Sequence, residues 1–219
     1  MRIYTLLLFL ICFLLKCDSD IKQPSTLNYK NTSVDYLPYF NTPDLTPQWK
    51  IKSHKIPSFS FKNQNDKIIT NAYYNGKIQI ADFFFTTCPG ICPKLTKNMY
   101  NIQEHYKSES NIRLVSFSVM PWVDNVEQLK NYSIANKVNS SKWNLLTGDK
   151  DKIYDLARNG FFADENYTKN QNDSEFIHTE NFVLVDPDGY IRGVYNGTIE
   201  FDVERLKRHI SILKEEYNL

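Results

Sequence analysis

The stretch Asp82-Phe-Phe-Phe-Thr-Thr-Cys88-Pro-Gly-Ile-Cys92-Pro93 joins an apolar run to two cysteines that stand four positions apart. The apolar run predicts a buried strand, and Pro93 opens a pattern of apolar residues at helical spacing. The two thiols are therefore delivered together at the end of a strand, where a helix begins. Two thiols so placed can form a disulfide or bind a soft metal ion, and the stretch alone leaves both open.

The chain around this stretch alternates between strand and helix patterns from residue 51 onward. We expect a hairpin at 56–61 and 67–70, strands at 77–85, 113–119 and 143–147, helices at 93–106 and 123–137, a helix opened by Asp149, a hairpin at 182–185 and 190–195, and a final helix at 203–217. Such alternation predicts an α/β fold, with a mainly parallel mixed sheet flanked by helices and an antiparallel pair at one side. Sites in such sheets lie at the carboxyl ends of the strands, which is where Cys88 falls.

The first 17 residues have the pattern of an export signal. Residues 3–15 are almost wholly apolar and follow Arg2, but they are fewer than the roughly 20 residues that span a bilayer. Leu14-Leu15-Lys16-Cys17 is similar to a bacterial lipobox, which predicts cleavage before Cys17 and its lipidation. An uncleaved anchor and simple secretion remain alternatives, because Lys16 replaces the usual small residue.

Residues 18–50 are rich in Asp, Asn, Ser, Thr and Pro and show no sustained periodicity, which predicts a tether. Aromatic residues between Tyr36 and Trp49 allow part of it to pack on the domain that follows. We therefore expect a soluble domain at 51–219, held at a membrane by the N-terminus.

The composition excludes some classes of partner. The chain has 26 Lys and Arg against 25 Asp and Glu, whereas a nucleic-acid-binding domain usually needs a basic face. Export leaves Cys88 and Cys92 as the free thiols beyond Cys17, so a disulfide-rich scaffold is also excluded.

The donor chemistry of the pair suits a soft metal ion and also thiol-disulfide exchange. Soft thiolates select Cu(I) and also Zn(II). A helix N-terminus favours thiolates for metal binding and for disulfide exchange alike. Asp82 is either a buried carboxylate that accepts a proton from Cys92 or a half-exposed acid. Met120 is a packing residue or a soft thioether near the metal.

Three motifs in order resemble the Sco family of copper-handling proteins that serve cytochrome c oxidase assembly. They are Thr87-Cys88-Pro-Gly-Ile-Cys92-Pro93, then Ser118-Val-Met-Pro121 with Asp124, then His178-Thr179 before Phe182-Val-Leu-Val-Asp-Pro-Asp-Gly189. The resemblance implies a thioredoxin-like fold over 51–217. It also implies one copper ion held by Cys88, Cys92 and His178. Two thiolates with one histidine would leave Zn(II) short of a closed tetrahedral shell, which favours copper. Many members have an acidic residue where this chain has Met120, so any role of that acid is absent here.

The resemblance implies a copper chaperone, not an enzyme in the strict sense, which faces the periplasm of a bacterial cell envelope. It would carry Cu(I), with Cu(II) also open, to the copper-bearing subunit of cytochrome c oxidase or to another copper protein. The alternative is a thiol-disulfide reductase that acts on a partner's copper-site cysteines through Cys88 and Cys92. Thioredoxin-like oxidoreductases commonly place a cis proline where this chain has His178-Thr179, and they have two residues between their cysteines, which favours the chaperone.

Overall fold

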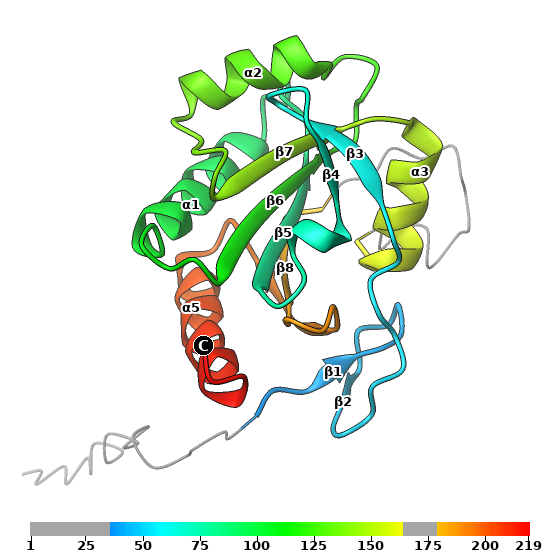
Figure 1. The fold of residues 1–219 in the computed structure, drawn as a ribbon, viewed down its shortest axis with the longest axis vertical. Coiled ribbons are helices and arrows are strands. Elements are labelled where there is room, and N and C mark those ends of the chain that lie inside the picture. The colour runs from blue at the N-terminus through cyan, green and yellow to red at the C-terminus, as the bar shows by residue number, and fades with distance from the viewer. Residues whose placement is uncertain (1–35, 164–178) are drawn as a thin grey trace, which may run out of the picture. The chain divides into compact units, whose positions relative to one another are not determined.

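Seven strands form one mixed sheet in the computed structural model, which describes residues 36–163 and 179–219 (Figure 1). In spatial order the strands are β4 (Ile68–Thr70), β3 (Ser60–Asn63), β7 (Trp143–Thr147), β6 (Ile112–Ser118), β5 (Ile78–Phe84), β8 (Asn181–Val185) and β9 (Ile191–Asn196). The helices are α1 (Cys92–His105), α2 (Val126–Ala135), α3 (Lys150–Asp155), which continues as a π-helical turn at Leu156–Gly160, and α5 (Glu200–Glu216). A short 3-10 turn spans Asn71–Tyr73.

The pairing of the strands confirms the α/β class and corrects one detail of the sheet. Strands β7, β6 and β5 are parallel, as the alternation predicts. The sequence predicts an antiparallel pair at one side, but hairpins flank the parallel core on both sides, because β3 pairs antiparallel with β7 and β8 pairs antiparallel with β5. Each hairpin thereby covers an edge of the parallel core that would otherwise leave backbone groups unpaired.

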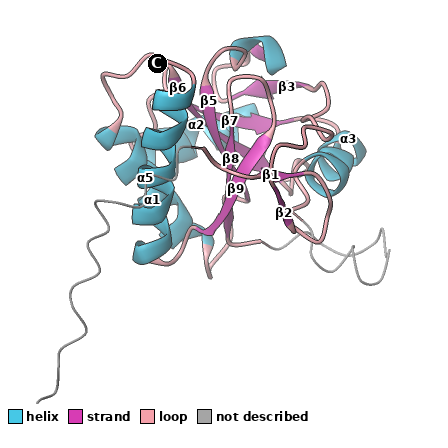
Figure 2. Ribbon diagram, turned by 90° about the horizontal axis from the view of Figure 1, so that it is seen from below, coloured by secondary structure: helices cyan, strands magenta, loops and turns pink. Residues whose placement is uncertain are grey.

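Strand β5 is buried along its whole length because both faces of the sheet are covered. Ile78 and Ile80 pack into a core with α1, α2 and α5, whereas Ala81 and Phe83 pack into a second core with α3 and the π-helical turn. Figures 1 and 2 show α1 and α5 on one side of the sheet and α3 on the other. This double covering explains why the sequence shows an apolar run here instead of alternation.

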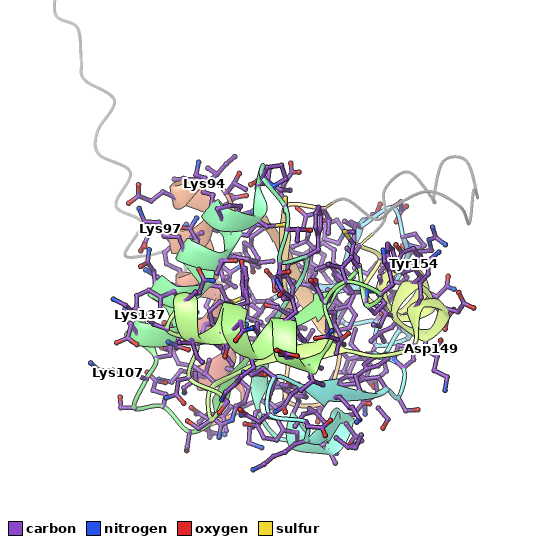
Figure 3. The ribbon with its side chains drawn as sticks, turned by 90° about the horizontal axis from the view of Figure 1, so that it is seen from above. Lys94, Lys97, Lys107, Lys137, Asp149 and Tyr154 are labelled. Atoms are coloured by element: carbon purple, nitrogen blue, oxygen red, sulfur yellow. The ribbon has the colours of Figure 1, made fainter. Side chains whose placement is uncertain are left out.

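Local capping sets where two of the helices begin. The Asp149 side chain accepts a hydrogen bond from the Lys152 backbone N–H at 3.0 Å, so the predicted helix start is confirmed (Figure 3). The Asn125 side chain accepts from the Gln128 N–H at 2.9 Å. Helix α2 therefore begins at Val126, three residues later than the apolar pattern suggests.

Part of the segment that the sequence assigns to the tether packs on the domain. Leu37 and Tyr39 are buried, and β1 (Tyr39–Phe40) pairs with β2 (Pro47–Gln48). The guanidinium group of Arg192 donates to the carbonyl oxygens of Leu37 and Pro38, at 2.6 and 3.2 Å. The packed structure therefore reaches at least to Leu37, as the aromatic residues of this segment suggest.

Candidate metal centre

The two cysteines lie where β5 gives way to α1. β5 ends at Phe84, the chain turns, and the Cys88 backbone N–H donates to the Phe85 carbonyl at 3.3 Å. Cys92 is the first residue of α1, and Pro93 follows it in the first turn. Proline suits this position because it has no backbone N–H, and an N–H here would have no acceptor within the helix. The local sequence thus places both thiols at one carboxyl edge of the sheet.

The two thiols have different environments. Burial disfavours the Cys88 thiolate, but the backbone N–H groups of Cys92, Gly90 and Ile91 and the Cys92 thiol stabilise it, so the pKa of Cys88 is lowered. Burial raises the pKa of Cys92 to about 12, and the hydrogen bond to Cys88 adds to the rise. In the reduced protein, Cys88 is therefore the thiol that loses its proton more readily, and the Cys92 thiol donates a hydrogen bond to it.

Asp82 is buried beneath this pair, on the sheet face that α1 covers. Its side chain is 2% exposed, and its Oδ1 has no hydrogen-bond partner among the described residues. Burial raises the pKa of Asp82 to about 7, although Ser116, its partner on β6, opposes the rise. Of the two interpretations of Asp82, the buried carboxylate agrees with this burial, while its part in proton transfer stays a prediction.

We expect Asp82→Asn to stabilise the reduced, metal-free protein at pH 8. The pKa of Asp82 is higher in the folded protein than in the unfolded chain, so the folded protein binds this proton more tightly. The free energy of unfolding therefore falls as the pH rises from about 4 to about 7. The substitution removes this loss, and we expect a gain on the order of 4 kcal/mol above pH 7. Urea unfolding between pH 4 and 8 measures it.

Asp151→Asn is the control for that experiment, because Asp151 is an exposed carboxylate near the start of α3. It should leave the pH dependence of unfolding unchanged. If Asp82→Asn and wild type keep a constant difference in the free energy of unfolding across this pH range, the carboxylate does not titrate as described.

Exposed lysines follow Cys92 on α1. Lys94 and Lys97 are exposed in the first two turns of α1, and Figure 3 shows both of them, with Lys137, on one side of the molecule. They give the exposed side of α1 a positive charge near its start.

The remaining predicted site residues divide into those the structure describes and those it does not. Met120 is half-buried after β6, and its backbone N–H donates to the Ser118 hydroxyl at 3.2 Å. Cys17 and His178 lie outside the described residues. Within 36–163 and 179–219, no three His, Cys, Asp or Glu side chains gather as a metal-binding set. The predicted third ligand, His178, therefore stays a prediction.

The other histidines have different surroundings. The Nε2 atom of His54 lies 2.7 Å from the Gly160 carbonyl oxygen, and the Nδ1 atom of His209 lies 2.8 Å from the Tyr195 hydroxyl. His105 is exposed on α1. His54 and His209 therefore each have a hydrogen-bond partner within the protein.

Sequence reasoning gave no role to one residue at this edge, Asp124. It is fully buried, and its carboxylate accepts hydrogen bonds from Thr86 and Ser118, which follow or end the two strands beside the site. The available signal was an acid just before a helix N-cap, six residues after a serine at a strand end. That pattern predicts a cap or a turn and does not reveal the contact with Thr86.

A parallel-core α/β sheet with two cysteines at the junction of a strand and a helix defines a thioredoxin-like protein with a Cys-X-X-X-Cys site. The profile of the SCO1/SenC family matches residues 48–213. The chain belongs to the SCO1/SenC family.

Relatives and solved structures give the same result. The SCO1 protein homolog of Bacillus subtilis is 34% identical over 147 residues, which cover 66% of this chain and 75% of that protein. The crystal structure of a SCO1/SenC family lipoprotein from Bacillus anthracis has a TM-score of 0.64 and 32% identity, over 75% of this chain and 97% of that one. BsSco, a Sco-family cytochrome c oxidase assembly protein with a disulfide switch, has a TM-score of 0.63 and 31% identity, over 78% and 99%.

Two more distant structures share the fold. Arabidopsis thaliana ScoI, with 23% identity and a TM-score of 0.54 over 74% of this chain and 98% of that one, was crystallised with copper bound. Yeast Sco1, with 20% identity and a TM-score of 0.55 over 74% and 95%, was also crystallised with copper bound.

Proposed function

We propose that this protein is a membrane-tethered copper chaperone that holds one copper ion through Cys88, Cys92 and His178 and supports copper-site assembly in cytochrome c oxidase. The observation that carries the proposal is the thiol pair at the start of α1, in which backbone N–H groups lower the pKa of Cys88 and the buried Cys92 lies beside it. Membership of the SCO1/SenC family and the copper found in other Sco proteins support it.

The arrangement suits a cargo that must be bound and then released. Copper binding requires both cysteines as thiolates, so the buried Cys92 thiol has to lose its proton, and Asp82 beneath it is the group that we propose receives it. Cu(I) is satisfied by two sulfurs and one nitrogen. Because Cys88 is half-buried, a partner's ligands can reach its side of the site and replace the protein's ligands one at a time.

The membrane tether is part of the same proposal. The predicted signal and Cys17 lie outside the described residues, and a lipoprotein of the same family from Bacillus anthracis supports a lipid anchor. Among the described helices, none is long and apolar enough to cross a bilayer. The anchor would hold the domain at the outer face of a bacterial membrane, where the copper-bearing subunit of the oxidase is the proposed acceptor.

A thiol-disulfide reductase is the second candidate, and the unequal thiols favour it specifically. A Cys88 with a lowered pKa is a ready attacking group, and Cys92 would resolve the mixed disulfide. A dithiol that must be reduced to bind copper can also switch between the two activities, as the disulfide switch in BsSco suggests. Turnover of a model disulfide that Cys88→Ser abolishes and His178→Ala leaves intact would support the reductase.

His178→Ala tests the chaperone directly. In the full-length reduced chain, purified in detergent without oxygen, we expect Cu(I) affinity to fall by at least about 10-fold, because the site loses its nitrogen ligand. Competition against a Cu(I)-specific chromophoric chelator measures it. His105→Ala removes an exposed histidine from α1 and should leave the affinity unchanged. Equal affinities for wild type and His178→Ala would reject His178 as a ligand.

A further inference from the structure

The Asp124 carboxylate joins the cysteine loop after β5 to the end of β6. It accepts from the Thr86 hydroxyl at 2.5 Å and from the Thr86 backbone N–H at 3.1 and 3.4 Å to its two oxygens. It also accepts from the Ser118 hydroxyl at 2.5 Å. Asp124 has no exposed surface, and both of its oxygens are used. One side chain therefore ties the loop after β5 to the end of β6.

Thr86 lies two residues before Cys88, which makes this contact relevant to the thiols. The Thr86 hydroxyl also accepts from the Gln128 side-chain amide of α2 at 2.9 Å. Below it, the strand ends are joined by a backbone bond from Val119 to the Phe84 carbonyl at 2.9 Å. Thr86, the residue through which the cysteine loop leaves the sheet, is therefore fixed by hydrogen bonds to both its backbone and its side chain.

The Ser118 contact extends the same network to the loop after β6. The Ser118 hydroxyl donates to Asp124 and accepts from the Met120 backbone N–H. The Asp124 backbone N–H donates back to the Met120 carbonyl at 2.8 Å, which closes the turn. The cysteine loop and the Met120 loop therefore cannot move apart without breaking charge-assisted hydrogen bonds.

We propose that Asp124 is a positioning residue of the metal centre: through Thr86 it fixes the cysteine loop so that Cys88 and Cys92 meet one copper ion. This proposal rests on the proposed function, since it assigns a part in copper binding. A carboxylate suits the position because it only accepts, and each of its neighbours here donates. An amide would replace one acceptor oxygen with an NH2 group that faces the Thr86 backbone N–H, which cannot accept, and it would weaken the bonds from the two hydroxyls. The loop would then relax away from its bound position.

Asp124→Asn in the full-length chain is the main test. Residues behind metal ligands typically contribute about 10–100-fold to affinity, and we expect Cu(I) binding to weaken by that range. The reduction potential of the Cys88–Cys92 disulfide should shift as well, because the loop that brings the sulfurs together is released. Asp186→Asn is the matched control: it changes a buried carboxylate at the β8–β9 turn, and we expect unchanged copper affinity whatever the loss of stability.

Two substitutions of Thr86 keep the proposal testable if Asp124→Asn does not fold. Thr86→Val removes the hydroxyl but keeps the shape of the side chain, and we expect weaker copper binding. Thr86→Ser keeps the hydroxyl and should retain the wild-type affinity. The proposal is overturned if Asp124→Asn binds copper with an affinity within threefold of wild type. If Asp124→Asn is unfolded, the same result in Thr86→Val overturns it.

The two proposals fail in distinguishable ways. If wild type itself binds no copper, the proposed function is rejected, and the disulfide reduction potential decides on Asp124 instead. The positioning role is then rejected if the reduction potential of Asp124→Asn equals the wild-type value. If Asp124→Asn is unfolded, Thr86→Val is measured in its place. A shifted potential with an unshifted Asp186→Asn control supports the positioning role.

Discussion

Replacing Cys88 with serine in the full-length reduced chain should weaken Cu(I) binding by more than about 100-fold, beyond the range typical of residues behind the ligands. Serine keeps the size of the side chain but offers a hydroxyl that stays protonated, whereas Cu(I) selects a thiolate. Cys92→Ser should have a similar effect, because the second sulfur completes the pair. Anaerobic competition titration with a Cu(I) chelator measures both.

Met120→Leu is the matched control for the cysteine variants. It removes a sulfur from the neighbouring loop with little change in volume, and we expect affinity within threefold of wild type. If Cys88→Ser binds copper as well as wild type does, the thiol pair is not the metal centre, and the reductase becomes the better proposal. A large loss in Met120→Leu would instead add the thioether to the ligand set.

Arg192→Met should destabilise the domain by about 3–5 kcal/mol, the usual effect of removing one partner from a buried ion pair. The Arg192 side chain is fully buried and donates to Asp186 at 3.1 Å and to both oxygens of Glu216 at 2.9 and 2.8 Å. It also donates to the Leu37 and Pro38 carbonyls and lies 4.1 Å from the centre of the Tyr39 ring. The substitution leaves the buried Asp186 carboxylate without its opposite charge and the two carbonyl oxygens without this donor.

Arg205→Met provides the comparison in the same urea-unfolding experiment. Arg205 pairs with Asp202 at 3.1 Å, but its side chain is 37% exposed, and such pairs contribute about 1 kcal/mol or less. We expect limited proteolysis of Arg192→Met to cut first between residues 36 and 50, because the cluster holds that segment. Equal stability losses in the two variants would show that the buried cluster is not a main support of the fold.

Most secondary-structure elements could be predicted because their signals are local. The apolar run before Cys88, the helical spacing after Pro93 and the capping residue Asp149 each lie within a few residues of the element that they define. Several boundaries moved by one to four residues: β3 begins at Ser60 where the pattern predicts 56, and α5 begins at Glu200 where it predicts 203. A capping side chain explains the shift at α2, where Asn125 precedes Val126. The predicted position of Cys88 and Cys92 at one edge of the sheet follows from the same local information.

The pairing of the sheet edges and the contacts that hold the N-terminal segment could not be predicted in this way. Whether a hairpin pairs with β7 or β5 depends on partners some 80 to 100 residues distant, and the sequence pattern of an edge strand does not name its neighbour. Residues 36–50 have the composition of a tether, yet Arg192, some 150 residues further along the chain, binds two of their carbonyl groups. A long-range hydrogen bond leaves no periodic signal.

The sequence by itself determined the fold class and the thiol pair, because a buried strand that ends in two cysteines before a helix is specified by neighbouring residues. The tertiary structure decided how those thiols differ and what supports them. The unequal pKa values of Cys88 and Cys92, the burial of Asp82 and the contact from Asp124 to Thr86 all depend on packing between separate elements. Burial and hydrogen bonding are properties of the folded surroundings, and no single segment contains them.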